Sequence, residues 1–326
     1  MVYECLMDVA DKYDLFLFDA YGVFWEGNGF YHNSRETMAQ LVHMGKTVVI
    51  ISNTTQLQDD IVAGYIKRGL LPKRDYNYII TSGDLLRSHL LKGDITFDCC
   101  PNPSKYYVIG LPHYKAFAGS KYLPVDNLEE ADFVYCGVPF MFKYDVKKYP
   151  QYKEQYWPVK NNENGEIEIW DTLTPEPFRE IVEKAVALHK PALNANPDFT
   201  AKEGHPLVQG APAVFVVRNG TLAEMFRKSG AEVLEFGKPH KNIYEYTFGV
   251  LQNKGLVIDK SRTCMIGDTV RTDIKGALNA GVSPILCVET GVTAEEILKG
   301  NSVESLCKKE NIDVNKIIQI KSVGGK

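Results

Sequence analysis

Leu15-Phe16-Leu17-Phe18-Asp19-Ala20-Tyr21-Gly22 is the stretch that decides the fold, because four consecutive apolar residues end abruptly in a carboxylate. Three further apolar runs end in the same way, namely 47–51 before Ser52 and Asn53, 263–266 before Gly267 and Asp268, and 284–288 before Glu289. Continuous apolar runs without alternation are typical of strands that are covered on both faces, as in a parallel sheet.

Helical patterns separate these apolar runs. They cover residues 35–44, 242–251 and 272–280, and Gly45 and Gly281 follow the first and the last of them as helix stop signals. Alternation of strand and helix predicts an α/β fold with an open, doubly wound parallel sheet of the Rossmann type. Such sheets bind ligands at the carboxyl ends of their strands, where each polar residue falls.

The middle of the chain reads as an inserted domain. Candidate strands at 106–109 and 132–136 precede a stretch rich in Tyr, Lys, Asn and Pro at 140–164, and residues 174–190 have the apolar spacing of a helix. About a hundred residues can bury a small core of their own. We therefore predict a smaller α/β cap domain at 83–194, inserted into a core made of 1–82 and 195–326. A disordered loop at 140–164 is the alternative, which its aromatic residues disfavour.

Composition excludes several classes of function. The net charge of −4 offers no electrostatic attraction for nucleic acid. No apolar run approaches the ~18 residues that span a bilayer, and the first residues lack a signal-peptide pattern. The seven cysteines are scattered without zinc-site spacing, which favours reduced thiols and a cytoplasmic location.

Four short features carry the candidate chemistry. They are Asp19 with Gly22, Ser52-Asn53, Lys238 between a glycine and a proline, and Gly267-Asp268 with Asp273 five residues later. Singly they have plain structural explanations, such as a turn, a helix cap or a solvated lysine. Together they place three carboxylates, one ammonium and one hydroxyl at one sheet edge. That set suits phosphoryl transfer, which needs a cation to neutralise phosphate oxygens and donors to hold them.

In these features the sequence resembles the haloacid dehalogenase superfamily. It is most similar to the branch whose cap lies between the second and third motifs, which contains p-nitrophenyl-phosphate and phosphoglycolate phosphatases. The resemblance covers nearly the whole chain and includes residues 196–198 (Asn-Pro-Asp), which in that branch mark the return from cap to core. It also includes Ile243-Tyr244 and the stretch 267–274.

The resemblance implies catalytic and phosphate-binding roles. Asp19 would attack phosphorus and form an aspartyl-phosphate that water later hydrolyses. Ser52 would donate its hydroxyl, and Asn53 its backbone N–H, to phosphate oxygens. Lys238 would hold the nucleophile and the phosphate together as a point charge.

The resemblance also implies a Mg²⁺ site. Asp19, Asp268 and the backbone carbonyl of Tyr21 would bind the ion, with waters completing its octahedron. Asp273 would orient Lys238 or the water shell of the metal, or it would only cap the helix that follows. The expected partner is a small phosphorylated metabolite, and a homodimer through the cap domain is a further expectation.

Tyr21 departs from the family pattern. Most phosphatases of the superfamily carry a second aspartate at this catalytic position, which protonates the leaving oxygen and then activates water. Tyrosine, with an ordinary pKa near ~10, is a poor general base at neutral pH. Asp-Ala-Tyr-Gly is also how the true dehalogenases look at this motif, since halide leaves without a proton.

Two alternatives therefore stay open. One is a metal-free haloacid dehalogenase-like hydrolase, against which Asp268 and the position of the cap argue. The other is a weakly active homologue that binds a phosphorylated ligand, against which the retained Asp19 and Lys238 argue. Substrate choice has no clear signal, because the polar and aromatic cap residues could contact a ligand or build the cap itself: Tyr106, Tyr107, His113, Tyr114, Lys115, His205 and Arg218.

Overall fold

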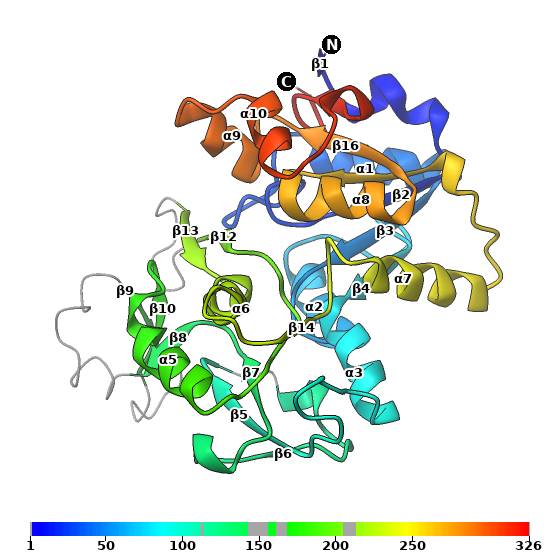
Figure 1. Cartoon of the computed structure of the whole chain (residues 1–326). Helices are drawn as coiled ribbons and strands as arrows, with labels where there is room; N and C mark the ends of the chain where they lie inside the picture. Colours follow the sequence, from blue (N-terminus) through cyan, green and yellow to red (C-terminus); the bar gives the residue numbers. More distant parts are fainter. Residues whose placement is uncertain (1, 112–113, 143–155, 161–167, 205–212, 326) are drawn as a thin grey trace. The chain divides into compact units, whose positions relative to one another are not determined.

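The computed structural model describes residues 2–111, 114–142, 156–160, 168–204 and 213–325. The chain divides into two compact units, one made of Met1–Leu85 with Gly237–Lys326 and the other of Leu86–Phe236. We call them the core unit and the inserted unit. Figure 1 colours both by sequence, so the core unit takes the two ends of the colour bar.

The core unit is built on a seven-stranded parallel sheet in the order β1-β17-β16-β15-β2-β3-β4. Its strands are β1 (Val2–Tyr3), β2 (Leu15–Phe18), β3 (Thr47–Ser52), β4 (Tyr78–Thr81), β15 (Thr263–Gly267), β16 (Ser283–Cys287) and β17 (Ile318–Ile320). Every residue of β2 and β15 is buried, as their unbroken apolar runs predict. The α/β class and the parallel core sheet predicted from the sequence are thus confirmed.

Helices connect these strands. They are α1 (Ser34–His43), α2 (Gln58–Lys67), α3 (Ser82–Lys92), α7 (Lys241–Asn253), α8 (Lys275–Ala280), α9 (Gly291–Leu298) and α10 (Val303–Lys309), with a π-helical turn at Val270–Ile274 before α8. Gly45 and Gly281 have φ of 79° and 76°, the left-handed conformation that ends a helix. None of the helices among the described residues is long and apolar enough to cross a membrane.

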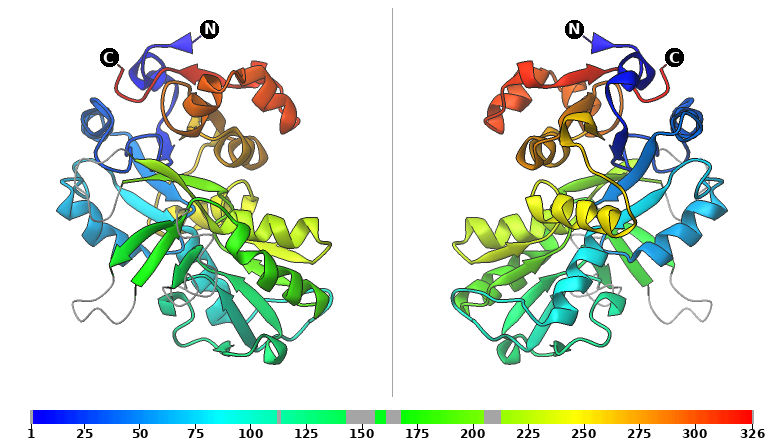
Figure 2. Two further views of the ribbon diagram at one scale, coloured as in Figure 1. Left: turned by 90° about the vertical axis from the view of Figure 1, so that its left-hand side faces the viewer. Right: turned by 90° about the vertical axis from the view of Figure 1, so that its right-hand side faces the viewer.

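The strand order reverses next to β2. From β2 the chain moves outward to β3 and β4, whereas from β15 it moves to β16 and β17 in the opposite direction. The carboxyl ends of β2 and β15 therefore flank the switch point where open α/β sheets bind ligands. Figure 2 shows β1 and β17, near the two ends of the chain, side by side at the far edge of this sheet.

The inserted unit has its own parallel sheet, in the order β14-β11-β7-β5-β6, and its own apolar cluster around Val134, Val182 and Phe226. The strands are β5 (Lys105–Ile109), β6 (Leu123–Pro124), β7 (Phe133–Cys136), β11 (Ala192–Asn194) and β14 (Val233–Glu235), with helices α5 (Arg179–Ala187) and α6 (Asn219–Lys228). Two antiparallel sheets accompany it, built from β8 (Phe140–Phe142), β9 (Tyr156–Lys160) and β10 (Glu168–Thr172), and from β12 (Thr200–Glu203) and β13 (Val214–Val217).

The boundary of the inserted unit corrects the predicted one. The sequence placed the return to the core at residue 195, but residues up to Phe236 belong to the inserted unit. The cause is that β14 pairs with β11, and that Leu222 and Phe226 of α6 pack into the inserted unit's apolar cluster. Residues 196–198 therefore lie within the inserted unit rather than at its exit.

The helix predicted at 174–190 is present as a short 3-10 turn, Glu176–Phe178, followed by α5. The stretch 140–164 contains β8 and β9, which were not predicted, while residues 143–155 and 161–164 lie outside the described residues.

Candidate active site

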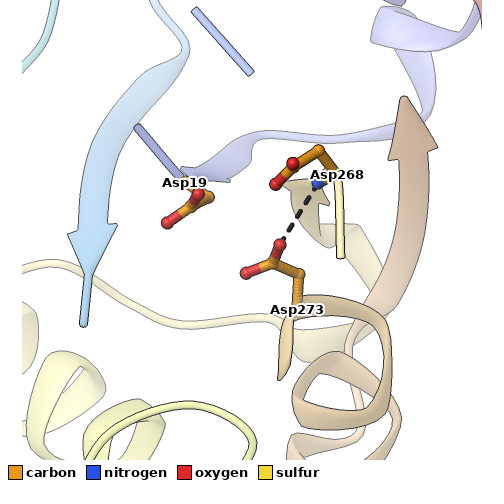
Figure 3. A group of neighbouring side chains, drawn as sticks. All are labelled: Asp19, Asp268 and Asp273. Atoms are coloured by element: carbon orange, nitrogen blue, oxygen red, sulfur yellow. Dashed lines mark hydrogen bonds between the residues drawn. The ribbon is translucent and has the colours of Figure 1, made fainter. Parts of the chain in front are cut away.

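Asp19 and Asp268 leave neighbouring strands at the same edge of the core sheet. Phe18 of β2 lies opposite Ile266 of β15, and the N–H of Asp19 donates to the Ile266 carbonyl at 2.9 Å. Asp273 joins them from the π-helical turn, and Figure 3 shows the three side chains close together. One oxygen of each lies within 4.8 Å of the others.

The π-helical turn sets the position of Asp273. The N–H groups of Asp273 and Ile274 both donate to the Thr269 carbonyl, at 3.0 and 3.3 Å, which widens the turn by one residue. The Asp273 Oδ2 then accepts from the N–H groups of Asp268 (3.2 Å) and Thr269 (3.1 Å). A Cβ on Gly267 would lie 2.1 Å from the Asp273 Cβ, so only glycine permits this approach. Such π turns are frequent at functional sites.

Lys238 is a buried ammonium held by two carboxylates. Its side chain is 1% exposed, and its Nζ donates to Asp273 Oδ1 at 2.8 Å and to Asp19 Oδ1. Burial of an unpaired charge costs several kcal/mol, which these two partners offset. The solvated surface lysine considered from the sequence is therefore excluded, and the ammonium lies directly against the candidate nucleophile.

Asp268 is fixed by the first residues of α9, the helix that follows β16. Its Oδ2 accepts from the Val292 N–H at 2.6 Å, and its carbonyl accepts from the Thr293 N–H (3.1 Å) and hydroxyl (2.6 Å). A Cβ on Gly291 or Gly22 would lie 1.9 or 2.2 Å from Asp268 Oδ2. The sequence did not identify the start of α9 as part of the site, although Gly291, three residues after the apolar run 284–288, was a signal.

Ser52 and Asn53 come from the end of β3, on the other side of β2 from β15. Both are buried. The Ser52 Oγ accepts from the Thr54 N–H at 3.3 Å, a short turn that keeps the hydroxyl at the sheet edge.

Tyr21 is half-buried and belongs to a tight turn after β2. The N–H groups of Phe24 and Trp25 both donate to the Ala20 carbonyl, at 3.2 and 3.0 Å, and the Tyr21 side chain packs against the apolar cluster of the core unit. The ring therefore contributes to the core, where a carboxylate at the same position would not.

Three phenols near the carboxylates stay neutral. Burial raises the pKa of Tyr31, Tyr65 and Tyr244 above the ordinary range of tyrosine, and nearby carboxylates raise it further. Tyr31 also accepts the Gly291 N–H at 3.4 Å. These phenols therefore add no negative charge beside the aspartates.

The cap residues considered for substrate contact lie in different surroundings. Tyr106 is 1% exposed and stacks on Phe117 with ring centroids 4.1 Å apart, so it builds the inserted unit rather than a ligand surface. Arg218 is buried in an ion pair with Glu203. Tyr107 is partly buried against the apolar cluster, and Lys115 is exposed. His113, His205 and the side chain of Tyr114 lie outside the described residues.

Two family models match the chain. A haloacid dehalogenase-like hydrolase model matches residues 16–119, and a HAD-hydrolase-like model matches residues 235–306. These segments contain the strand ends that carry Asp19 and Asp268.

Two of the relatives with assigned activities are phosphatases. The acid sugar phosphatase of Staphylococcus haemolyticus is 29% identical over 147 residues, 43% of this chain and 49% of that protein, so the match spans about half the length of that relative. Phosphoglycolate phosphatase 2 of Arabidopsis thaliana is 26% identical over 300 residues, 90% of this chain and 89% of that protein. A crystal structure of a haloacid dehalogenase-like hydrolase from Brucella suis superposes with a TM-score of 0.69 at 25% identity, covering 98% of both chains.

Proposed function

We propose that the chain, which belongs to the haloacid dehalogenase superfamily of hydrolases, is one of its phosphatases. It releases phosphate from a small phosphorylated metabolite in a Mg²⁺-dependent reaction through phospho-Asp19. One observation carries the proposal. The buried Lys238 ammonium is held between Asp19 and Asp273 while Asp268 lies beside them, which gathers a nucleophile, a phosphate-binding cation and a metal-binding carboxylate in one place.

In the first step an Asp19 oxygen forms a bond to phosphorus as the bond to the leaving oxygen breaks. Lys238 binds Asp19 Oδ1, which supports attack by Oδ2 and neutralises charge that develops on the phosphate. The Ser52 hydroxyl and the Asn53 N–H would hold two phosphate oxygens. In the second step water attacks phosphorus and releases phosphate and the Asp19 carboxylate.

The donor set fits Mg²⁺. Carboxylate and carbonyl oxygens are its preferred ligands, and Asp19, Asp268 and the Tyr21 carbonyl would supply them. Asp273 already accepts from Lys238 and from two backbone N–H groups, so we assign it to orient Lys238 and the metal's waters rather than to bind the ion directly. When bound, the ion would neutralise the phosphate and the aspartates together.

The site disfavours the two alternatives. A metal-free dehalogenase has no use for Asp268, whose carboxylate is positioned by the Val292 N–H beside Asp19. A protein that only binds phosphorylated ligands has no need to hold a lysine ammonium against its Asp19 carboxylate. We also propose a cytoplasmic location, because all seven cysteines are free thiols.

The test is phosphate release from p-nitrophenyl phosphate with Mg²⁺ and with excess chelator, followed by a panel of small phosphorylated metabolites. Asp19→Asn serves as the blank. We expect turnover with Mg²⁺, none in chelator and none in Asp19→Asn. Full activity in chelator would exclude the metal-dependent mechanism.

A further inference from the structure

The side chain of Asn53 binds both backbone polar groups of Lys238. Its Oδ1 accepts from the Lys238 N–H at 2.7 Å, and its Nδ2 donates to the Lys238 carbonyl at 3.1 Å. The two residues are 185 positions apart in the sequence and both are buried. One amide side chain thus ties the turn after β3 to the turn that precedes α7.

Lys238 needs such a partner because it lies in a turn rather than in a helix or strand. Its N–H and carbonyl are buried, and buried backbone groups without a partner destabilise the fold. Asn53 provides a donor and an acceptor at once. Aspartate, which has the same size, could accept from the N–H but could not donate to the carbonyl when ionised.

Asn53 is itself held in one orientation. The Ser82 hydroxyl, at the first residue of α3, donates to Asn53 Oδ1 at 3.3 Å. The Lys238 N–H and carbonyl define which end of the amide is oxygen and which is nitrogen, and the Ser82 contact is compatible with that orientation. The amide is therefore a fixed support rather than a mobile polar group.

Lysine carries its charge on a flexible four-carbon stem, so the ammonium stays in place only if the stem is fixed at both ends. Asp273 fixes the Nζ end. We infer that Asn53, through its side chain, is the positioning residue that fixes the backbone end and so aims Lys238 at Asp19. This inference rests on the proposed function for its catalytic consequence, and it differs from the phosphate contact proposed for the Asn53 N–H.

The first test measures turnover of p-nitrophenyl phosphate. We expect Asn53→Ala to lower kcat by about 10²-fold, the cost of a misplacement near 1 Å, with a smaller change in KM. In a Lys238→Met background, measured by burst or single-turnover assay, the same substitution should add less than about twofold, because its effect passes through Lys238. An equal loss in both backgrounds would show that Asn53 acts on the phosphate itself and would overturn the inference.

Asn77 offers a matched control. Its Oδ1 accepts from the Val48 N–H at 2.7 Å, and its own backbone N–H donates to the Val48 carbonyl at 2.8 Å. This contact lies at the amino ends of β3 and β4, whereas Asn53 follows the carboxyl end of β3. We expect Asn77→Ala to lower the melting temperature and to leave kcat within about twofold of wild type. Asn53→Ala with lowered stability and unchanged kcat would behave like this control and would contradict the inference.

A second readout does not depend on activity. Brief acetylation of the folded protein, followed by mass spectrometry, reports access to the Lys238 ammonium, with exposed Lys299 as the internal reference. We expect Lys238 to react several-fold faster in Asn53→Ala than in wild type, and Asn77→Ala to match wild type.

If wild type hydrolyses no phosphate ester, the proposed function fails while this labelling still decides the inference. If Asn53→Ala does not fold, Asn53→Asp should show the same change, and unchanged labelling in that variant overturns the inference.

Discussion

Three aspartates of identical chemistry acquire different roles from their partners. Asp273 accepts from Lys238 and two backbone N–H groups, Asp19 accepts from Lys238, and Asp268 accepts from the Val292 N–H. Their positions in the sequence suggest the chemistry, but the N–H donors that distinguish them have no side-chain signature. The sequence therefore identified Asp268 as a candidate ligand and did not identify residues 291–293 as its support.

Asp268→Asn should separate function from stability. In the proposed mechanism, loss of the carboxylate removes a metal ligand, so we expect Mg²⁺-dependent turnover to fall by about 10²-fold or more. The same change removes one charge from three carboxylates whose oxygens lie within 4.8 Å of one another, of which only Asp19 and Asp273 pair with Lys238, so the melting temperature in chelator should not fall, while the Mg²⁺-induced rise should disappear. Thermal unfolding with and without Mg²⁺ measures both, and exposed Asp126→Asn is the control. A Mg²⁺-induced rise equal to that of wild type would exclude Asp268 as a ligand.

Tyr21 should make the rate depend on the leaving group. Without a carboxylate at position 21 to protonate the leaving oxygen, aryl and acyl phosphates should react fast and alkyl phosphates slowly. Tyr21→Asp should reduce the ratio of the aryl to the alkyl phosphate rate by about 10²-fold. Because the ring packs against the core cluster, the variant's melting temperature must be compared with that of wild type first. Similar wild-type rates for alkyl and aryl phosphates would mean that another residue supplies the proton.

At the scale of elements, the sequence predicts strands and helices well where burial imposes a clear apolar pattern on the residues. The runs that become β2, β3, β15 and β16 are apolar throughout because both faces of a parallel sheet are covered. Very short strands such as β1, at the sheet edge, and β17, next to it, carry little pattern and were not predicted. The assignment of 195–236 failed for a different reason, since periodicity identifies a strand or helix but not the sheet that it joins.

The π-helical turn gives a test at this scale. Gly267→Ala would place a Cβ 2.1 Å from the Asp273 Cβ, so we expect the turn to shift, Lys238 to lose its partner, and both stability and kcat to fall. Gly249 in α7 is the matched control, because a Cβ there meets nothing within 4 Å. Gly249→Ala should stabilise the protein by roughly 0.5–1 kcal/mol and leave kcat unchanged. Urea unfolding and steady-state rates measure these effects, and wild-type kcat in Gly267→Ala would contradict the role given to the turn.

At the scale of the molecule, the site residues belong to one unit. Asp19, Ser52, Asn53, Lys238, Asp268 and Asp273 all lie in the core unit, although the insertion of residues 86–236 separates them in the sequence. Each unit has a buried apolar cluster of its own. A ligand that binds these residues should therefore stabilise the core unit specifically.

Urea unfolding with Mg²⁺ and beryllium fluoride, which imitates aspartyl-phosphate, tests that expectation. A ligand bound only to the native state stabilises it by about 2.7 kcal/mol at a hundred times its Kd. Trp25 reports on the core unit, and Trp157 and Trp170 lie in the inserted unit, so Trp25→Phe and a Trp157→Phe/Trp170→Phe double variant separate their signals. We expect the ligand to raise the Trp25 midpoint and to leave the other midpoint unchanged, with no rise in Asp19→Ala. Equal shifts of both signals would mean that the two units unfold as one cooperative body. An equal rise in Asp19→Ala would exclude Asp19 as the phosphate acceptor, because the analogue would then bind without the carboxylate that it is meant to join.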